Sequence, residues 1–310
     1  MTRAELLPDG KTYRVFPPER VGAVETLFDR LSHLAPPAAT ILLGLDFPIG
    51  LPRAYATTAG LREGGFRKAL ALLGGEGPWR RFYEISANPE ITSPFYPPPT
   101  NVKGLYSKRA LVNALKQNST NDLLRHCDLR TAIRLAAESL FFTLGGKQVG
   151  PSVIEGWSKL LAPALDRIRM WPFDGELSAL VAKPGIVVAE IYPGEAYSHL
   201  GLTNGIGRKL GRKLSKRRRE DRKLVSPAIL SQASSQLEIS SSAKTCIESG
   251  FLEEDDFDAT VGLFSMLQVV NGGRAANVPD DPDVRLIEGW ILGQEALAVL
   301  PAKRSASGRG

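Results

Sequence analysis

The hydrophobic pattern at the start of the chain predicts two strands, a helix and a third strand. Residues 3–15, "RAELLPDGKTYRV", hold two short runs around the turn-forming sequence Pro-Asp-Gly, which favours a β-hairpin. Apolar residues recur at helical spacing in 21–34, and two prolines end that pattern. Residues 39–46, "ATILLGLD", are apolar without polar alternation, which is typical of a central strand covered on both faces.

The middle of the chain has a different pattern, which predicts a helical insertion over about residues 53–180. Residues 95–100, "FYPPPT", are expected to form a loop or polyproline segment, since consecutive prolines cannot join a helix or sheet ladder. Residues 121–144 predict a long helix, and residues 152–168 predict another. The apolar run "GIVVAEIY" (185–192) then resumes the sheet.

The last third of the chain begins with a basic run at 207–224, which has ten lysines or arginines between Arg208 and Lys223. Residues 255–270 have the pattern of a helix, and 284–293, "VRLIEGWILG", predict a late strand. The polar end at 301–310 is expected to be a disordered tail.

Composition and charge narrow the class of protein. The 310 residues are 43% hydrophobic and 23% charged, as in ordinary globular domains, and no apolar run approaches the roughly 18 residues of a membrane span. The first residues lack the pattern of a signal peptide. Cys127 and Cys246 have no metal-ligand spacing, which favours reduced thiols and a cytoplasmic protein. Three histidines argue against a histidine-rich zinc site, and the net charge of +6 fits an anionic partner.

Two acids stand where predicted strands end. Asp46 follows one apolar strand and Glu190 ends another, and a proline comes shortly after each. Ligands of open α/β sheets bind outside the carboxyl ends of the strands, so neighbouring strands would bring these carboxylates together. Converging carboxylates raise each other's pKa unless a cation neutralises them, and Mg²⁺ or Mn²⁺ is the usual cation for phosphate chemistry. The alternative is that each acid is simply the first polar residue of a loop.

The helix at 255–270 supplies further acids. Asp255 and Asp258 are three residues apart and share a helical face, which Gly262 and Ser265 continue. Small residues there would let the helix approach another backbone closely. The alternative is that acids in a first helical turn complement the helix dipole and cap free amides.

The basic run also has two interpretations. Most such runs are solvated or disordered, whereas a nucleic-acid contact would bind phosphates with salt-dependent affinity. Glu220 and Asp221 interrupt the run, which favours a folded role. The candidate nucleic-acid-binding residues are Lys216, Arg217, Arg218, Arg219 and Arg222.

Several stretches, in order along most of the chain, resemble a bacterial family known as domain of unknown function 429 (DUF429), a predicted nuclease with a ribonuclease H-like fold. They are "GLDFPIGLP" (44–52), "GGKQVGPSVIEGW" (145–157), "WPFDG" (171–175), "AEIYPGEAY" (189–197), "KRRREDR" (216–222), "DDFDATVGLFSML" (255–267) and "EGWI" (288–291).

The resemblance implies one α/β domain over residues 1–300, with a five-stranded mixed sheet flanked by helices and the helical insertion at 53–180. It also implies carboxylates clustered around Mg²⁺ or Mn²⁺. Asp46 matches the strand-end acid of the family, Glu190 the acid of its "E-x-Y-P" motif, and Asp258 the acid of its final "D-A" helix. Asp255 is a further member of the implied metal site.

One feature departs from this family. Ribonuclease H-like folds open with a strand that carries a first catalytic aspartate, and a hairpin follows it. Here the hairpin follows Met1 almost at once. We expect that the true start lies upstream, that another segment fills the gap, or that this copy has lost the site.

These observations predict a metal-dependent nuclease or phosphodiesterase, with Asp46, Glu190 and Asp258 as catalytic residues and nucleic acid as the partner. The alternative is a non-catalytic module of the same fold that binds nucleic acid or protein. A phosphotransfer enzyme on a related sheet is a third hypothesis. The chain lacks a glycine-rich phosphate hairpin beside an acid near Met1, which counts against it.

Overall fold

The computed structural model describes most of the chain in six segments, which are residues 1–96, 108–131, 134–143, 149–202, 206–209 and 212–295. The expected tail at 301–310, and residues 97–100 of the expected polyproline loop, lie outside these segments. The fold is mixed α/β, with small sheets and many helices. None of the helices in these segments combines the length and apolar character that a membrane crossing needs.

The predicted hairpin is confirmed. Strands β1 (Ala4–Leu6) and β2 (Tyr13–Val15) pair antiparallel. Asp9 closes the turn, because its Oδ1 accepts hydrogen bonds from the backbone N–H groups of Lys11 and Thr12, both at 2.9 Å. Strand β8 (Leu237–Ile239) adds to β2 in parallel and completes a three-stranded sheet.

The second sheet carries the strands that end in acids. Strands β3 (Thr40–Leu45), β5 (Gly185–Glu190) and β4 (Ile168–Met170) are parallel, in the order β3-β5-β4. The central strand is therefore β5, and the prediction that the 39–46 strand is central is wrong, although both of its faces are covered as expected. In the segments that the structure describes, no strand pairs with the outer edge of β3, which leaves most of β3 half-buried.

The sheets do not form the single five-stranded sheet that the family resemblance implies. Among the residues described, β1-β2-β8 and β3-β5-β4 remain separate, and β6 (Arg208–Lys209) pairs only with β7 (Arg212–Lys213). Strand β4 lies inside the predicted helical insertion, so part of that block belongs to the sheet.

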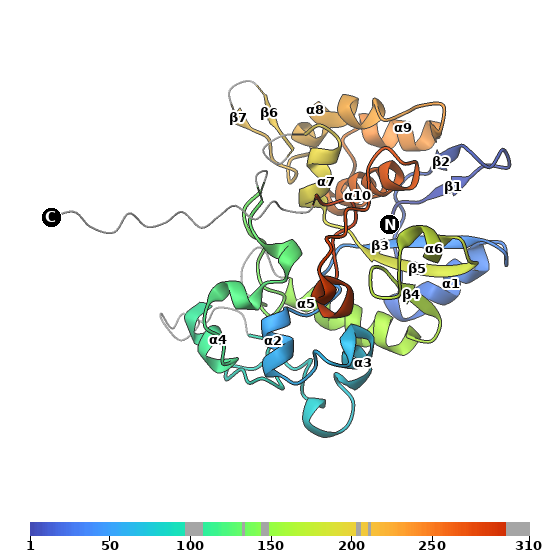
Figure 1. The fold of residues 1–310 in the computed structure, drawn as a ribbon. Helices are drawn as coiled ribbons and strands as arrows, with labels where there is room; N and C mark the ends of the chain where they lie inside the picture. The colour runs from blue at the N-terminus through green and yellow to red at the C-terminus, as the bar shows by residue number, and fades with distance from the viewer. Residues whose placement is uncertain (97–107, 132–133, 144–148, 203–205, 210–211, 296–310) are drawn as a thin grey trace.

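The helices fall into two groups (Figure 1). One gathers at the bottom of the view and the other at the top, where α10 lies beside the β1–β2 hairpin. The lower group is α2 (Arg53–Thr58), α3 (Gly65–Leu72), α4 (Lys108–Ala114) and α5 (Gly150–Glu155). The upper group is α7 (Pro193–His199), α8 (Arg219–Leu230), α9 (Ser241–Glu248) and α10 (Glu254–Val270). Helices α1 (Leu27–Leu34) and α6 (Leu177–Val181) lie beside the β3-β5-β4 sheet.

The helix predicted over residues 121–144 is wrong. The described part of this range forms only short 3₁₀ turns, Thr120–Leu123 and His126–Asp128, joined by irregular chain. Side chains compete here with helical hydrogen bonding: Asp122 accepts from the N–H of Ser119 at 2.9 Å, and Asp128 accepts from the N–H of Arg125 at 3.0 Å. The helix predicted at 152–168 is largely confirmed, because α5 continues as π-helical and 3₁₀ turns to Ala164.

The strand predicted over 284–293 is also wrong. Residues Val284–Glu288 form a short π-helical turn, and only Ile291 makes a β-bridge, with Glu190. Gly289 has φ of +72°, and a Cβ there would lie 2.1 Å from the carbonyl oxygen of Ile49. The close approach of these two backbones requires a turn, which interrupts the apolar pattern of a strand.

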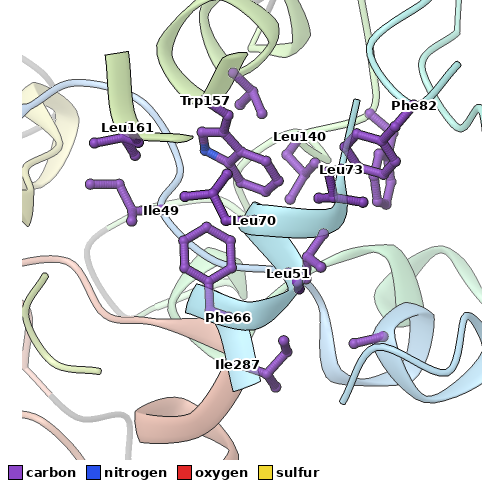
Figure 2. Close-up of a cluster of buried hydrophobic side chains, with 14 of the residues drawn as sticks. Ile49, Leu51, Phe66, Leu70, Leu73, Phe82, Leu140, Trp157, Leu161 and Ile287 are labelled. Carbon is purple, nitrogen blue, oxygen red and sulfur yellow. The ribbon is translucent and has the colours of Figure 1, made fainter. Parts of the chain in front are cut away.

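Two cores cover opposite faces of the β3–β5 pair. Leu45, Ile186 and Val188 belong to the large core under the lower helices, in which Phe66 and Trp157 pack edge to face (Figure 2). Val187 and Ala189 belong to a core with α10 on the other face. The alternation of side chains along the strands therefore decides which acid faces which core.

Candidate functional site

Asp46 lies at the carboxyl end of β3, on the face covered by α10. Two glycines bring sheet and helix together there. A Cβ on Gly44 would lie 2.4 Å from Met266 Sδ, and a Cβ on Gly262 would lie 2.5 Å from Ile191 Cδ1. The predicted close approach of the small-residue face of the helix is thus confirmed. It brings the first turns of α10 beside the end of β3.

Asp258 is the acid that α10 brings to this place. Its side chain is buried, and its Oδ1 accepts a hydrogen bond of 2.5 Å from the hydroxyl of Tyr197 in α7. Its Oδ2 accepts a hydrogen bond from Nζ of Lys216, which also lies 2.9 Å from Oε1 of Glu254. Asp258 is therefore oriented by a buried tyrosine and neutralised by a lysine.

Asp46 has an unusual electrostatic position. Burial raises its pKa to about 7, and the negative charge of Asp258 adds to this shift. Lys216 lowers the pKa in part, and the charges of Glu190 and Asp255 raise it. Solvent still reaches the side chain, so protein atoms crowd the carboxyl without covering it. Among the residues described, no hydrogen-bond or ion-pair partner is found for Asp46. A crowded, open and unpaired carboxyl of this kind is typical of functional sites.

The pKa values of the partners fit this arrangement. Burial raises the pKa of Asp258, while the hydrogen bonds from Lys216 and Tyr197 oppose the rise. Burial lowers the pKa of Lys216, but its bonds to Asp258 and Glu254 outweigh this effect and leave the pKa raised. Lys216 is therefore an ammonium ion at neutral pH. Asp255 lies on the exposed rim of the same helix turn.

Glu190 is placed differently from the prediction. Strands β3 and β5 are neighbours, as expected, but Glu190 points to the face opposite Asp46, where Arg125 binds it. The two guanidinium nitrogens of Arg125 donate to the two carboxylate oxygens at 2.5 and 2.7 Å, and the N–H of Ile49 donates at 2.8 Å. The two carboxylates therefore do not share one face as expected, although the charge of Glu190 still contributes to the raised pKa of Asp46.

Asp128 joins Glu190 in a second acidic group, which also includes Cys127. One ligand atom from each of the three lies within 4.8 Å of the others, so the group could hold a metal ion. The donors fit a metal poorly, because Arg125 already bonds both Asp128 oxygens at 2.9 Å as well as Glu190. Burial also raises the pKa of the Cys127 thiol well above its usual range, whereas a metal requires the thiolate.

The basic run divides into exposed and buried residues. Arg217, Arg218 and Arg219 are exposed at the start of α8. Arg222 is buried, and its guanidinium donates to the carbonyl oxygens of Lys216, at 2.6 Å, and Gly250, at 2.9 Å. The prediction that Arg222 contacts nucleic acid is therefore wrong, because its donors already bind carbonyls. The folded role that the interrupting acids indicated is confirmed, since Asp221 accepts from the N–H of Ser215 at 2.8 Å.

Sequence reasoning missed the roles of three residues. Tyr197 is part of the quoted "AEIYPGEAY" stretch, yet nothing in its spacing connects it with Asp258. Lys216 was predicted to bind nucleic-acid phosphate, whereas its side chain pairs with carboxylates. Arg125 lies in the range for which a long helix was predicted, so its buried role was not expected.

Comparison of the chain with protein-family models, with curated proteins and with solved structures finds no match in any of the three. The candidate site is therefore defined by this chain alone: the charge of Asp258 reaches Asp46 where β3 ends, and Tyr197 and Lys216 are the partners of Asp258.

Proposed function

We propose that this protein is a divalent-metal-dependent phosphodiesterase that cleaves nucleic acid, with Asp46 and Asp258 as its central carboxylates. One observation carries the proposal. Asp46, which is exposed and has no partner in the described segments, lies at the end of β3 beside the start of α10. There Tyr197 and Lys216 hold the carboxylate of Asp258, and crowding by protein atoms together with the charge of Asp258 raises the pKa of Asp46 to about 7. A site that gathers negative charge in this way favours a cation with oxygen ligands, such as Mg²⁺ or Mn²⁺.

The proposed ligands are carboxylate oxygens, which such an ion prefers. Asp46 and Asp258 supply carboxylate oxygens from two different elements, and Asp255 stands at the rim. A bound Mg²⁺ or Mn²⁺ would activate water and stabilise charge on phosphate oxygens. Tyr197 fixes the direction of the Asp258 carboxylate through its 2.5 Å hydrogen bond. The exposed Arg217, Arg218 and Arg219 bind the phosphates of the substrate backbone.

A ribonuclease H-like fold and membership of the DUF429 family belong to the same proposal. The order of hairpin, helix and parallel strand supports it, together with the acid at the end of β3 and the late helix α10 that carries Asp258. Glu190 leaves the proposed ligand set, because Arg125 binds both of its oxygens. In the proposed enzyme, Glu190 fixes the end of β5 through its hydrogen bonds with Arg125 and with the N–H of Ile49.

The test is cleavage by metal-stripped protein of labelled DNA and RNA, each single- and double-stranded. We expect products with Mn²⁺ or Mg²⁺ and none with a chelator. Asp46→Asn and Asp258→Asn should each abolish cleavage. Asp29→Asn is the matched control, since Asp29 is 53% exposed and pairs with Arg167 on the surface. Cleavage that persists in Asp46→Asn would exclude the proposal.

A second candidate is a non-catalytic module that binds nucleic acid. The observation that favours it is that two of the predicted catalytic acids already have cations: Lys216 neutralises Asp258 and Arg125 neutralises Glu190. Salt-sensitive binding without turnover, unchanged by a chelator, would support this function. Cleavage that a chelator stops would rule it out.

A further inference from the structure

We infer that Lys216 is a displaceable counter-cation of the Asp46–Asp258 site, which a divalent cation must push away from Asp258 in order to bind. This inference rests on the proposed metal site and adds a residue that controls its occupancy. The affinity of the site for a divalent cation then depends on Lys216, in the basic run, as well as on the carboxylates.

The first argument is where the ammonium lies. Lys216 Nζ contacts Oδ2 of Asp258 and Oε1 of Glu254. The lysine ammonium therefore already supplies a positive charge to the carboxylates at this end of α10. Its charge also reaches Asp46 and lowers the pKa of that carboxyl. A metal ion bound to Asp258 would need the oxygen that Lys216 now holds.

The second argument is that the side chain can leave while its backbone stays. The side chain of Lys216 is 38% exposed, against 12% for Asp258, so it can move towards solvent without opening the core. The Lys216 carbonyl is fixed by the buried Arg222, and the neighbouring Ser215 N–H is fixed by Asp221. A flexible stem on a fixed backbone suits a reversible contact.

The third argument is charge. Lys216 brings one positive charge to a place where Asp46, Asp258 and Glu254 bring three carboxyl groups, and Asp46 keeps no direct partner among the residues described. A divalent ion brings twice the charge and can bind two carboxylates at once. Exchange of the lysine for the ion therefore satisfies Asp46, which the lysine does not.

The direct test is the affinity for Mn²⁺, measured by calorimetry without nucleic acid. We expect Lys216→Met to bind Mn²⁺ about tenfold more tightly than the wild type, because the competing charge is gone. Lys216→Arg should bind as weakly as the wild type. Lys244→Met is the matched control, since Lys244 is 60% exposed and pairs with Glu248 on the surface of α9. Adding Asp258→Asn to Lys216→Met should remove the binding.

Equal or weaker Mn²⁺ affinity in Lys216→Met, or no binding in either protein, would overturn the inference. A second measurement covers the case in which Lys216→Met does not fold. In the wild type, Mn²⁺ should raise the acylation rate of Lys216, followed by mass spectrometry, while Lys244 stays unchanged. Mn²⁺ binding without a change at Lys216 would equally overturn it.

These outcomes are separate from the failure of the proposed function. Tighter Mn²⁺ binding by Lys216→Met without any cleavage supports the counter-cation and rejects the phosphodiesterase. Metal-dependent cleavage with an unchanged Mn²⁺ affinity in Lys216→Met supports the phosphodiesterase and rejects the counter-cation.

Discussion

Asp46 and Glu190 end two neighbouring parallel strands, yet their side chains project to opposite faces of the sheet. Leu45 pairs with Glu190 in the register of β3 and β5, and the Ile191 N–H continues the ladder to the Leu45 carbonyl at 2.9 Å. Side chains alternate along a strand, so Asp46, one residue beyond Leu45, faces α10. Similar sequence positions thus have different roles, one acid open to solvent and the other bound to a buried arginine.

Glu190→Gln should destabilise the protein. It replaces a buried carboxylate that accepts from both guanidinium nitrogens of Arg125 by an amide that can accept only on one atom. A lost hydrogen bond to a charged group costs about 1.5–3 kcal/mol, although Arg125 keeps its pair with Asp128. Urea denaturation measures the loss of free energy of unfolding. Glu155→Gln is the control, because Glu155 is 54% exposed and pairs with Lys159, a kind of contact worth less than about 1 kcal/mol. A stable Glu190→Gln variant without activity would instead return Glu190 to the catalytic site.

Asp46→Asn should stabilise the metal-free protein. The folded-state pKa of Asp46 is raised to about 7 from 3.8, so ionisation opposes folding as the pH rises through this window. The difference in Tm between Asp46→Asn and wild type should therefore grow from about pH 4 to pH 7 and level off above it. Thermal melts in a chelator measure it. A Tm of Asp46→Asn below that of the wild type at pH 8 would contradict the raised pKa of Asp46. Asp29→Asn again serves as the surface control.

Gly44→Ala should separate α10 from β3. The added Cβ would lie 2.4 Å from Met266 Sδ and 2.9 Å from Ile191 Cγ2, and overpacking of this kind costs about 1–3 kcal/mol. Because α10 carries Asp258, Mn²⁺ affinity should fall together with stability. Gly273→Ala is the control, since its nearest contact would be 3.4 Å away. Unchanged stability in Gly44→Ala would show that the interface repacks without strain.

The arginines of the basic run should separate into two classes. Replacing Arg217 and Arg218 together by Gln should leave Tm unchanged, weaken nucleic-acid binding and reduce the slope of its salt dependence by up to about two. Arg219 is kept, because its Nε donates to the carbonyl oxygen of Ser249 at 2.9 Å. Arg222→Gln should lower Tm, because it leaves buried carbonyls, including those of Gly250 and Phe251, without their donor. Binding titrations at several salt concentrations, with thermal melts, measure both effects. Equal effects of the two substitutions on Tm would contradict this division.

His199 should make stability depend on pH. Burial lowers its pKa to about 4 from 6.5, with a further contribution from Arg274, and its Nδ1 lies 2.6 Å from Ser265 Oγ. Between pH 6.5 and 4 the unfolded chain binds a proton that the folded protein excludes, so stability falls as the pH falls, by up to about 1.4 kcal/mol per unit. His199→Gln should flatten this slope in urea denaturation series. A slope equal to that of the wild type would contradict the buried neutral imidazole.

Local pattern in the sequence determined much of the fold and some of the site. The hairpin, the two main parallel strands, α10 with its small-residue face, and the acids at Asp46 and Asp258 follow from short-range periodicity and turn chemistry, which act between near neighbours in the chain. The folded role of the basic run was also indicated, through the acids that interrupt it.

Tertiary structure alone decided how those parts combine. Register, which no local pattern specifies, turned Glu190 away from Asp46. A buried Arg125, paired with Asp128 and Glu190, replaced the expected helix with turns, because tertiary contacts outweigh the small helix propensities of single residues. The contacts of Asp258 with Tyr197 and Lys216 cross 61 and 42 residues of sequence, and only the packing of α7, α8 and α10 brings them together.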